Sequence, residues 1–195
     1  ETKTNTVLSI FKKMNEEKRK EVGTSLSSNT YKKYDLTYRR LEEFISFRFK
    51  KERYKDIPLN EVDEEFITGF RNFLRVDKKV GHNATSKMMQ LFKKAITRAR
   101  NAGMIQSNPF TQPITFVQVD KGFLTMDELQ TIMNKDIDID RLQRVRDVFV
   151  FSCFTGLAFA DVSTLKKEDL VQDNNGDWWI RKGRIKLMHR HKASS

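Results

Sequence analysis

The stretch Ser28–Phe49, SNTYKKYDLTYRRLEEFISFRF, carries the clearest structural pattern in the chain. Its large apolar and aromatic side chains recur every three or four residues, at Tyr31, Tyr34, Tyr38, Leu41, Ile45 and Phe49. This spacing places them on one face of an α-helix. Ser28, Asn29 and Thr30 are residue types that favour the start of a helix. The pattern therefore predicts an amphipathic helix that ends near Phe49.

Three further segments before residue 105 show the same periodicity. One helix is expected from Val7 onward, a second over Val62–Leu74 and a third over Ala84–Asn101, which Gly103 would end. Together with the helix of residues 31–49 they would make four amphipathic helices joined by short loops. This arrangement predicts a compact four-helix bundle.

The helical periodicity of the sequence is interrupted after the bundle. Pro109 and Pro113 disfavour helix and favour extended backbone. We therefore divide the chain into a helical domain at residues 1–112, a linker at 113–120 and a second domain at 121–195.

The second domain is expected to combine helices with a hairpin. Thr125 and Glu128 have the spacing of a capping box, which predicts a helix start. A helix over Arg141–Phe154 is rich in Val, Phe and Leu, so we expect it to be deeply buried. A turn at residues 174–176 precedes alternating side chains, which is typical of a short hairpin. The fold class is thus mainly α, with a bundle followed by the helical and β-hairpin start of an α+β domain.

The charge of the chain is strongly positive and unevenly distributed. The formal net charge is +11, and residues 1–115 carry +10 of it. Such a surface favours nucleic acid as the partner. A spanning helix is not expected, because no apolar run approaches the length of about 18 residues that it needs. An anionic membrane is not the expected partner either, because no basic amphipathic segment also carries a broad, exposed apolar face. The single cysteine, Cys153, excludes an internal disulfide and a cysteine-rich zinc site, and we expect it to be a buried, reduced thiol.

One face of the Ala84–Asn101 helix is suited to contact DNA. Lys87, Gln90, Lys94, Thr97 and Arg98 lie on the side opposite its apolar residues. Lysine and arginine there would follow a phosphate backbone, and Gln90 or Asn83 would reach a base edge. The residues that we predict to contact DNA are Lys32, Lys33, Arg39, Arg40, Asn83, Thr85, Lys87, Gln90, Lys94, Arg98 and, near the hairpin, Arg184. The alternative is that this face is an ordinary solvated surface.

A second stretch, RDVFVFSCFTGLAFADVSTLKKEDL at residues 146–170, resembles the tyrosine recombinase (phage-type integrase) family. The likeness is greatest to integrases of mobile elements from the Bacteroides group and extends over nearly the whole chain. It implies that the bundle is a SAM-like core-binding domain and that residues 121–195 are the first part of the catalytic domain. The family cleaves DNA with a tyrosine nucleophile and needs no metal or cofactor.

The resemblance assigns roles to a few residues. The first active-site box of the family begins Thr-Gly-Leu-Arg, and here Thr155, Gly156 and Leu157 are followed by Ala158 instead of arginine. Asp161 matches the acidic position of the box.

Two further candidates for catalytic roles lie outside the box. Arg146 is a possible surrogate for the missing arginine, and the alternative is that it pairs with Asp147 or another carboxylate. Lys186 is the candidate general acid, with an ordinary basic strand edge as its alternative.

Two parts of the family's catalytic machinery find no match. The His-x-x-Arg box has no counterpart, and all four tyrosines, at positions 31, 34, 38 and 54, lie within the bundle. We therefore expect that this chain alone does not cleave DNA and that its catalytic domain is truncated. The leading interpretation is the DNA-binding portion of an integrase, which clamps duplex DNA together with other protomers in the bacterial cytoplasm. The alternatives are a truncated DNA-binding protein that does not cut, or a helical protein-interaction module with no nucleic-acid role.

Overall fold

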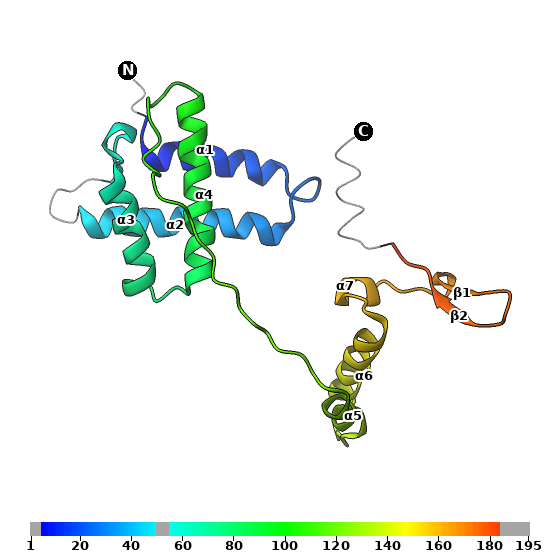
Figure 1. Ribbon diagram of the computed structural model, residues 1–195. Helices are drawn as coiled ribbons and strands as arrows, with labels where there is room; N and C mark the ends of the chain where they lie inside the picture. Colours follow the sequence, from blue (N-terminus) through cyan, green and yellow to red (C-terminus); the bar gives the residue numbers. More distant parts are fainter. Residues whose placement is uncertain (1–4, 50–54, 184–195) are drawn as a thin grey trace. The chain divides into compact units, whose positions relative to one another are not determined.

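The computed structural model describes residues 5–49 and 55–183 and separates the chain into two compact units (Figure 1). The first, Glu1–Val119, is called the N-terminal unit, and the second, Asp120–Ser195, the C-terminal unit. Each unit is described by itself. The predicted fold class is confirmed: both units are mainly helical, and one small hairpin follows the helices.

The N-terminal unit is built from four α-helices and two short helical turns. The helices are α1 (Val7–Lys20), α2 (Ser28–Arg48), α3 (Glu64–Asn72) and α4 (His82–Asn101). A 3₁₀ turn, η1 (Leu59–Glu61), precedes α3, and a π-helical turn, η2 (Phe73–Asp77), continues it. The helices α1 and α2 pack against each other, and α4 crosses and contacts both of them (Figure 1).

A cluster of phenylalanine rings forms the centre of this unit. Phe44 of α2 lies 5.1 Å, 5.5 Å and 5.5 Å, between ring centroids, from Phe66, Phe70 and Phe73. Phe92 of α4 contacts Phe66 and Phe70 from the other side, at 6.2 Å and 5.8 Å. Tilted and edge-on ring pairs at such distances contribute about 0.5–1.5 kcal/mol each beyond the burial of their area. The rings thus join α2, α3 and α4 into one core.

The structure differs from the sequence prediction over Val62–Leu74. The helix begins at Glu64, because the Asp63 side chain accepts a hydrogen bond from the Phe66 amide at 2.7 Å and caps it. Val62 is buried but extended. At its other end the helix widens into η2, which carries it past the predicted end at Leu74 to Asp77.

The C-terminal unit consists of short elements. Its helices are α5 (Met126–Asn134), α6 (Asp140–Thr155) and α7 (Phe159–Val162), followed by a 3₁₀ turn, η3 (Lys167–Asp169). Strands β1 (Leu170–Gln172) and β2 (Trp178–Ile180) pair antiparallel, with Val171 opposite Trp179. The predicted capping box is present: the Thr125 amide donates to Glu128 at 2.8 Å, and the Glu128 amide donates to Thr125 Oγ1 at 3.3 Å.

The expectation that the helix over Arg141–Phe154 is deeply buried is wrong. No residue of α6 is buried, Phe154 is 59% exposed, and Cys153 is an exposed thiol rather than a core one. In the described part of this unit, only Leu129 and Asp161 are buried. The physical reason is that α5 and α7 are too short to cover the apolar face of α6. Among the described residues, no helix is long and apolar enough to cross a membrane.

We expect Gly69→Ala to destabilise the N-terminal unit. A Cβ at Gly69 would lie 3.1 Å from Phe44 Cζ and 2.9 Å from Arg48 Nη1. Overpacking of this kind costs about 1–3 kcal/mol, against a gain of about 1 kcal/mol that alanine brings to a helix interior, so we expect a net loss of up to about 2 kcal/mol. Urea unfolding measures the net loss. In a Phe44→Leu background the ring is gone, so Gly69→Ala should become neutral or stabilising. An equal penalty in both backgrounds would contradict the proposed clash.

We also expect the chain of residues 1–195 to self-associate at micromolar concentration. Phe123 is 92% exposed in the C-terminal unit, and Phe154 and Phe159 are exposed there too. Apolar surface of this kind favours association. Light scattering should report particles above the monomer mass, and the triple substitution of these residues by serine should lower that mass. A monodisperse monomer that binds no apolar dye would overturn this expectation.

Candidate nucleic-acid interface

The predicted DNA-binding residues of α2 divide into two groups. Lys32 and Lys33 are exposed, and their side chains make no hydrogen bond or ion pair with another described residue. Arg39 instead forms an ion pair with Asp35, one turn earlier on the helix. Arg40 donates to Glu43 at 2.8 Å, and Lys78 approaches the same carboxylate at 2.7 Å. Hydrogen bonds from Lys78 and then Arg40 hold the pKa of the Glu43 carboxyl below its ordinary value. The two arginines are therefore already paired with carboxylates.

Two of the basic residues predicted on α4 hold this helix against its neighbours. Lys94 Nζ lies 3.2 Å from the hydroxyl oxygen of Tyr34 and 5.8 Å from the centroid of that ring. Arg98 Nη2 donates to Glu17 of α1 at 2.5 Å. The exposed Arg98–Glu17 ion pair contributes only about 0–1 kcal/mol, but it pairs this arginine with a carboxylate of α1. Lys94 is directed toward α2 by Tyr34 and keeps its charge without a carboxylate partner among the described residues.

Asn83 and Thr85, both predicted to contact DNA, are engaged within the protein. The Asn83 side chain donates from Nδ2 to the Val117 carbonyl at 2.8 Å and accepts from the Val117 amide at 2.9 Å. Ser86 Oγ donates to the Thr115 carbonyl at 2.6 Å. Thr85 is only 3% exposed. These bonds tie residues 115–117, which we call the strap, to the first turns of α4. In this structure the Asn83 amide is thus not free to read a base.

Lys87 and Gln90 are the first exposed residues of the predicted α4 face, and Lys94 and Arg98 are exposed further along it. Lys87 Nζ lies 3.3 Å from Gln90 Oε1 and 5.6 Å from the centroid of the Phe116 ring. Neither contact neutralises the lysine charge. Of the predicted set, four lysines therefore keep a positive charge with no carboxylate partner among the described residues: Lys32, Lys33, Lys87 and Lys94.

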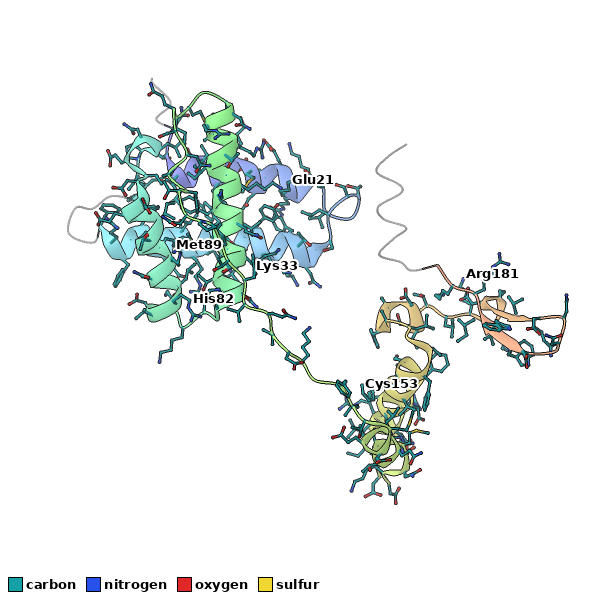
Figure 2. All side chains as sticks on the ribbon, viewed as in Figure 1. Glu21, Lys33, His82, Met89, Cys153 and Arg181 are labelled. Carbon is teal, nitrogen blue, oxygen red and sulfur yellow. The ribbon has the colours of Figure 1, made fainter. Side chains whose placement is uncertain are left out.

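Sequence reasoning missed three basic residues that lie near the start of α4: Arg71, Arg75 and His82. Arg71 and Arg75 are four residues apart on α3 and η2, and they line a hollow together with His82. His82 is labelled at the start of α4 in Figure 2. The i, i+4 spacing of the two arginines was the available signal, since such residues share a helix face.

The box of residues 155–161 forms the end of one helix and the start of the next. Gly156 has a φ of 66°, a left-handed conformation that ends α6 and that glycine adopts without strain. Thr155 Oγ1 donates to the Phe151 carbonyl at 2.7 Å. Ala158 is the residue before α7, and Asp161 is 4% exposed.

The candidates for phosphate chemistry are not brought together at this box. Arg146 donates through Nε to Asp147 at 3.0 Å and through Nη1 to the Lys135 carbonyl at 2.7 Å. This pairing is the alternative left open by the sequence, and the surrogate role stays a prediction. Lys186 and Arg184 lie outside the described residues. Within the described ranges, no group of three or more His, Cys, Asp or Glu residues could hold a metal ion.

Comparison with known proteins identifies the family. The model of the phage integrase SAM-like domain matches residues 6–119, so the chain belongs to that family. Its fold is similar to two structures of the Tn1549 transposon integrase, one in complex with a circular intermediate DNA and one with transposon right end DNA. The TM-scores are 0.62 and 0.60, and the sequence identities are 16% and 17%.

These matches are partial in length. The two alignments cover 93% and 92% of this chain but only 58% of the integrase chain in each case. No curated protein gives a significant sequence match. At this identity the likeness establishes a shared fold, and the function is argued separately below.

We expect Asn83→Ala to release the strap. The substitution removes both hydrogen bonds to Val117 and leaves the Ser86 bond to Thr115 as the remaining polar tie. Hydrogen exchange should show the Val117 amide exchanging at least ten-fold faster, while amides in the middle of α4 stay protected. Asn83→Asp is the control, because it keeps the acceptor for the Val117 amide and loses only the donor. Equal protection of the Val117 amide in the unmodified chain and in both variants would show that Asn83 does not hold the strap.

Proposed function

We propose that the N-terminal unit binds duplex DNA as the core-binding domain of a site-specific tyrosine recombinase. The observation that carries the proposal is the fold shared with an integrase whose structures were solved in complex with DNA. Membership of the phage integrase SAM-like domain family over residues 6–119 supports it. In this role the domain acts in a bacterial cytoplasm, beside other protomers on the same DNA.

The electrostatics of the N-terminal unit support the same role. Lys32, Lys33 and Lys87 are exposed cations without carboxylate partners among the described residues. Each lysine that neutralises a phosphate releases condensed counterions, and this release drives association at low salt. The paired residues Arg39, Arg40 and Arg98 would contribute less, because a DNA phosphate must compete with a carboxylate already in place.

DNA cleavage is not part of this proposal. The described part of the box supplies Thr155, Gly156 and Asp161, but Ala158 cannot grip a phosphate and Arg146 is paired with Asp147. No tyrosine follows residue 54 of the sequence. Strand exchange is a property that we propose only for a complete recombinase that contains this domain.

A second candidate function is protein interaction through the C-terminal unit. Apolar side chains such as Phe123, Phe154 and Trp178 are exposed in its described part. Patches of this kind mark surfaces that another protein covers. This candidate predicts no dependence of binding on the lysines of α2 and α4, so one experiment separates it from DNA binding.

The test is the binding of the full chain to random duplex DNA at nanomolar concentration as salt is raised. We expect a log–log slope of several units, because each phosphate contact contributes about 0.9. Lys33→Gln and Lys87→Gln should each lower the slope by about 0.9. The control is the double variant Asp35→Asn/Arg39→Gln, which removes both charges of the Asp35–Arg39 ion pair and so leaves the net charge unchanged. A flat salt dependence in the unmodified chain would overturn the proposed function.

A further inference from the structure

A hollow on the N-terminal unit lies between α3–η2, the first turns of α4 and residues 113–115. Its volume is about 120 Å³, and its walls include Arg71, Arg75, His82, Ser86, Met89 and Thr115. His82 and Met89 mark its position along α4 in Figure 2. A single ordered water needs roughly 10–15 Å³ of such space, so the hollow has room for a larger polar group.

The lining of the hollow is basic and contains no carboxylate. The Arg71 side chain makes no hydrogen bond or ion pair with another described residue. Arg75 donates from one nitrogen, Nη1, to the Val80 carbonyl at 3.0 Å, which leaves its other donors available. Glu64 lines a separate small hollow, which Arg71 also borders. Two guanidinium groups and an imidazole thus face one space without a counter-charge in its walls.

We propose that this hollow, which we call the Arg71–Arg75 pocket, binds a backbone phosphate of DNA. The inference rests on the proposed function and adds a contact away from Lys32 and Lys33. The planar guanidinium fork matches two oxygens of one phosphate, and two forks can share the charge of a single diester. The His82 ring adds a further nitrogen donor, and Met89 closes the apolar floor.

The strap forms part of the pocket wall, so a bound phosphate would also affect the strap. Thr115 belongs to the wall, and its carbonyl is held by Ser86 at 2.6 Å. Asn83 fixes Val117 two residues further on. A phosphate in the pocket would therefore lie against residues whose path is set by α4, and DNA binding would restrain the strap as well as the helices.

The first arm of the test measures DNA affinity. The double variant Arg71→Gln/Arg75→Gln should weaken binding of the full chain to a duplex by at least ten-fold at low salt. Arg19→Gln/Lys20→Gln, at the exposed end of α1, removes the same charge elsewhere and should have a smaller effect. Arg71→Lys/Arg75→Lys keeps the charge and loses the fork, so it should recover only part of the affinity. Thermal unfolding checks that each variant is folded.

The second arm locates the ligand. Phenylglyoxal modifies accessible arginines, and peptide mass mapping of the full chain reports each site separately. Duplex DNA should protect Arg71 and Arg75 at a concentration where inorganic phosphate protects them weakly or not at all. Protection by phosphate but not by duplex would assign the pocket to a small phosphate-bearing ligand and overturn the proposal. So would unchanged modification with both.

The two arms separate this inference from the proposed function. If Lys33→Gln and Lys87→Gln weaken DNA binding while the Arg71/Arg75 double variant does not, the domain binds DNA and the pocket does not take part. If the unmodified chain does not bind duplex DNA at all, the proposed function is wrong, and so is the proposal that the Arg71–Arg75 pocket binds a DNA phosphate.

Discussion

The contact between the Phe44 ring and the side of α3 at Gly69 is the constraint on which the N-terminal unit depends. Phe44 occupies the space that a side chain at Gly69 would fill, and it meets three further rings from α3 and η2. This close approach fixes the distance between α2 and α3. Phe92 then packs on two of the same rings from α4, so the position of the crossing helix follows from it. The surface cations and the arginines of the Arg71–Arg75 pocket lie on helices that this cluster joins, and the strap is hydrogen-bonded to one of them, α4.

Positive charge on this unit has two different physical roles. Arg39 and Arg40 form ion pairs with carboxylates of their own helix, α2. Arg98 forms an ion pair with Glu17 of α1, and Lys94 contacts Tyr34 of α2, so these two residues link α4 to its neighbours. Lys32, Lys33 and the pocket arginines have no carboxylate partner among the described residues. Net charge alone does not distinguish the two groups, because a paired and an unpaired arginine count equally in the sequence. The distinction depends on which acids the fold brings within reach.

The local parts of the fold could be predicted from the sequence. The periodicity of α2, the helix after Val7, the Thr125–Glu128 capping box and the hairpin depend on residues close together in the chain, and the structure contains them all. The exposure of α6 could not be predicted, because burial depends on which other elements cover a helix. The clamp of Asn83 on Val117 joins residues 34 positions apart, and its partner is a backbone group that any residue type would offer. The roles of Arg146 and Lys186 stay predictions.

The left-handed turn at Gly156 shows that the Thr-Gly-Leu motif has a structural role that does not depend on its chemical role. Its glycine is needed to stop α6 and turn the backbone, and Thr155 bonds within that same helix end. These requirements persist whether or not an arginine follows. A chain with alanine at position 158 can thus keep the recognisable outline of a recombinase box as a hinge between helices. The motif for this reason describes the shape of the chain here, and the ability to cut DNA has to be judged from other residues.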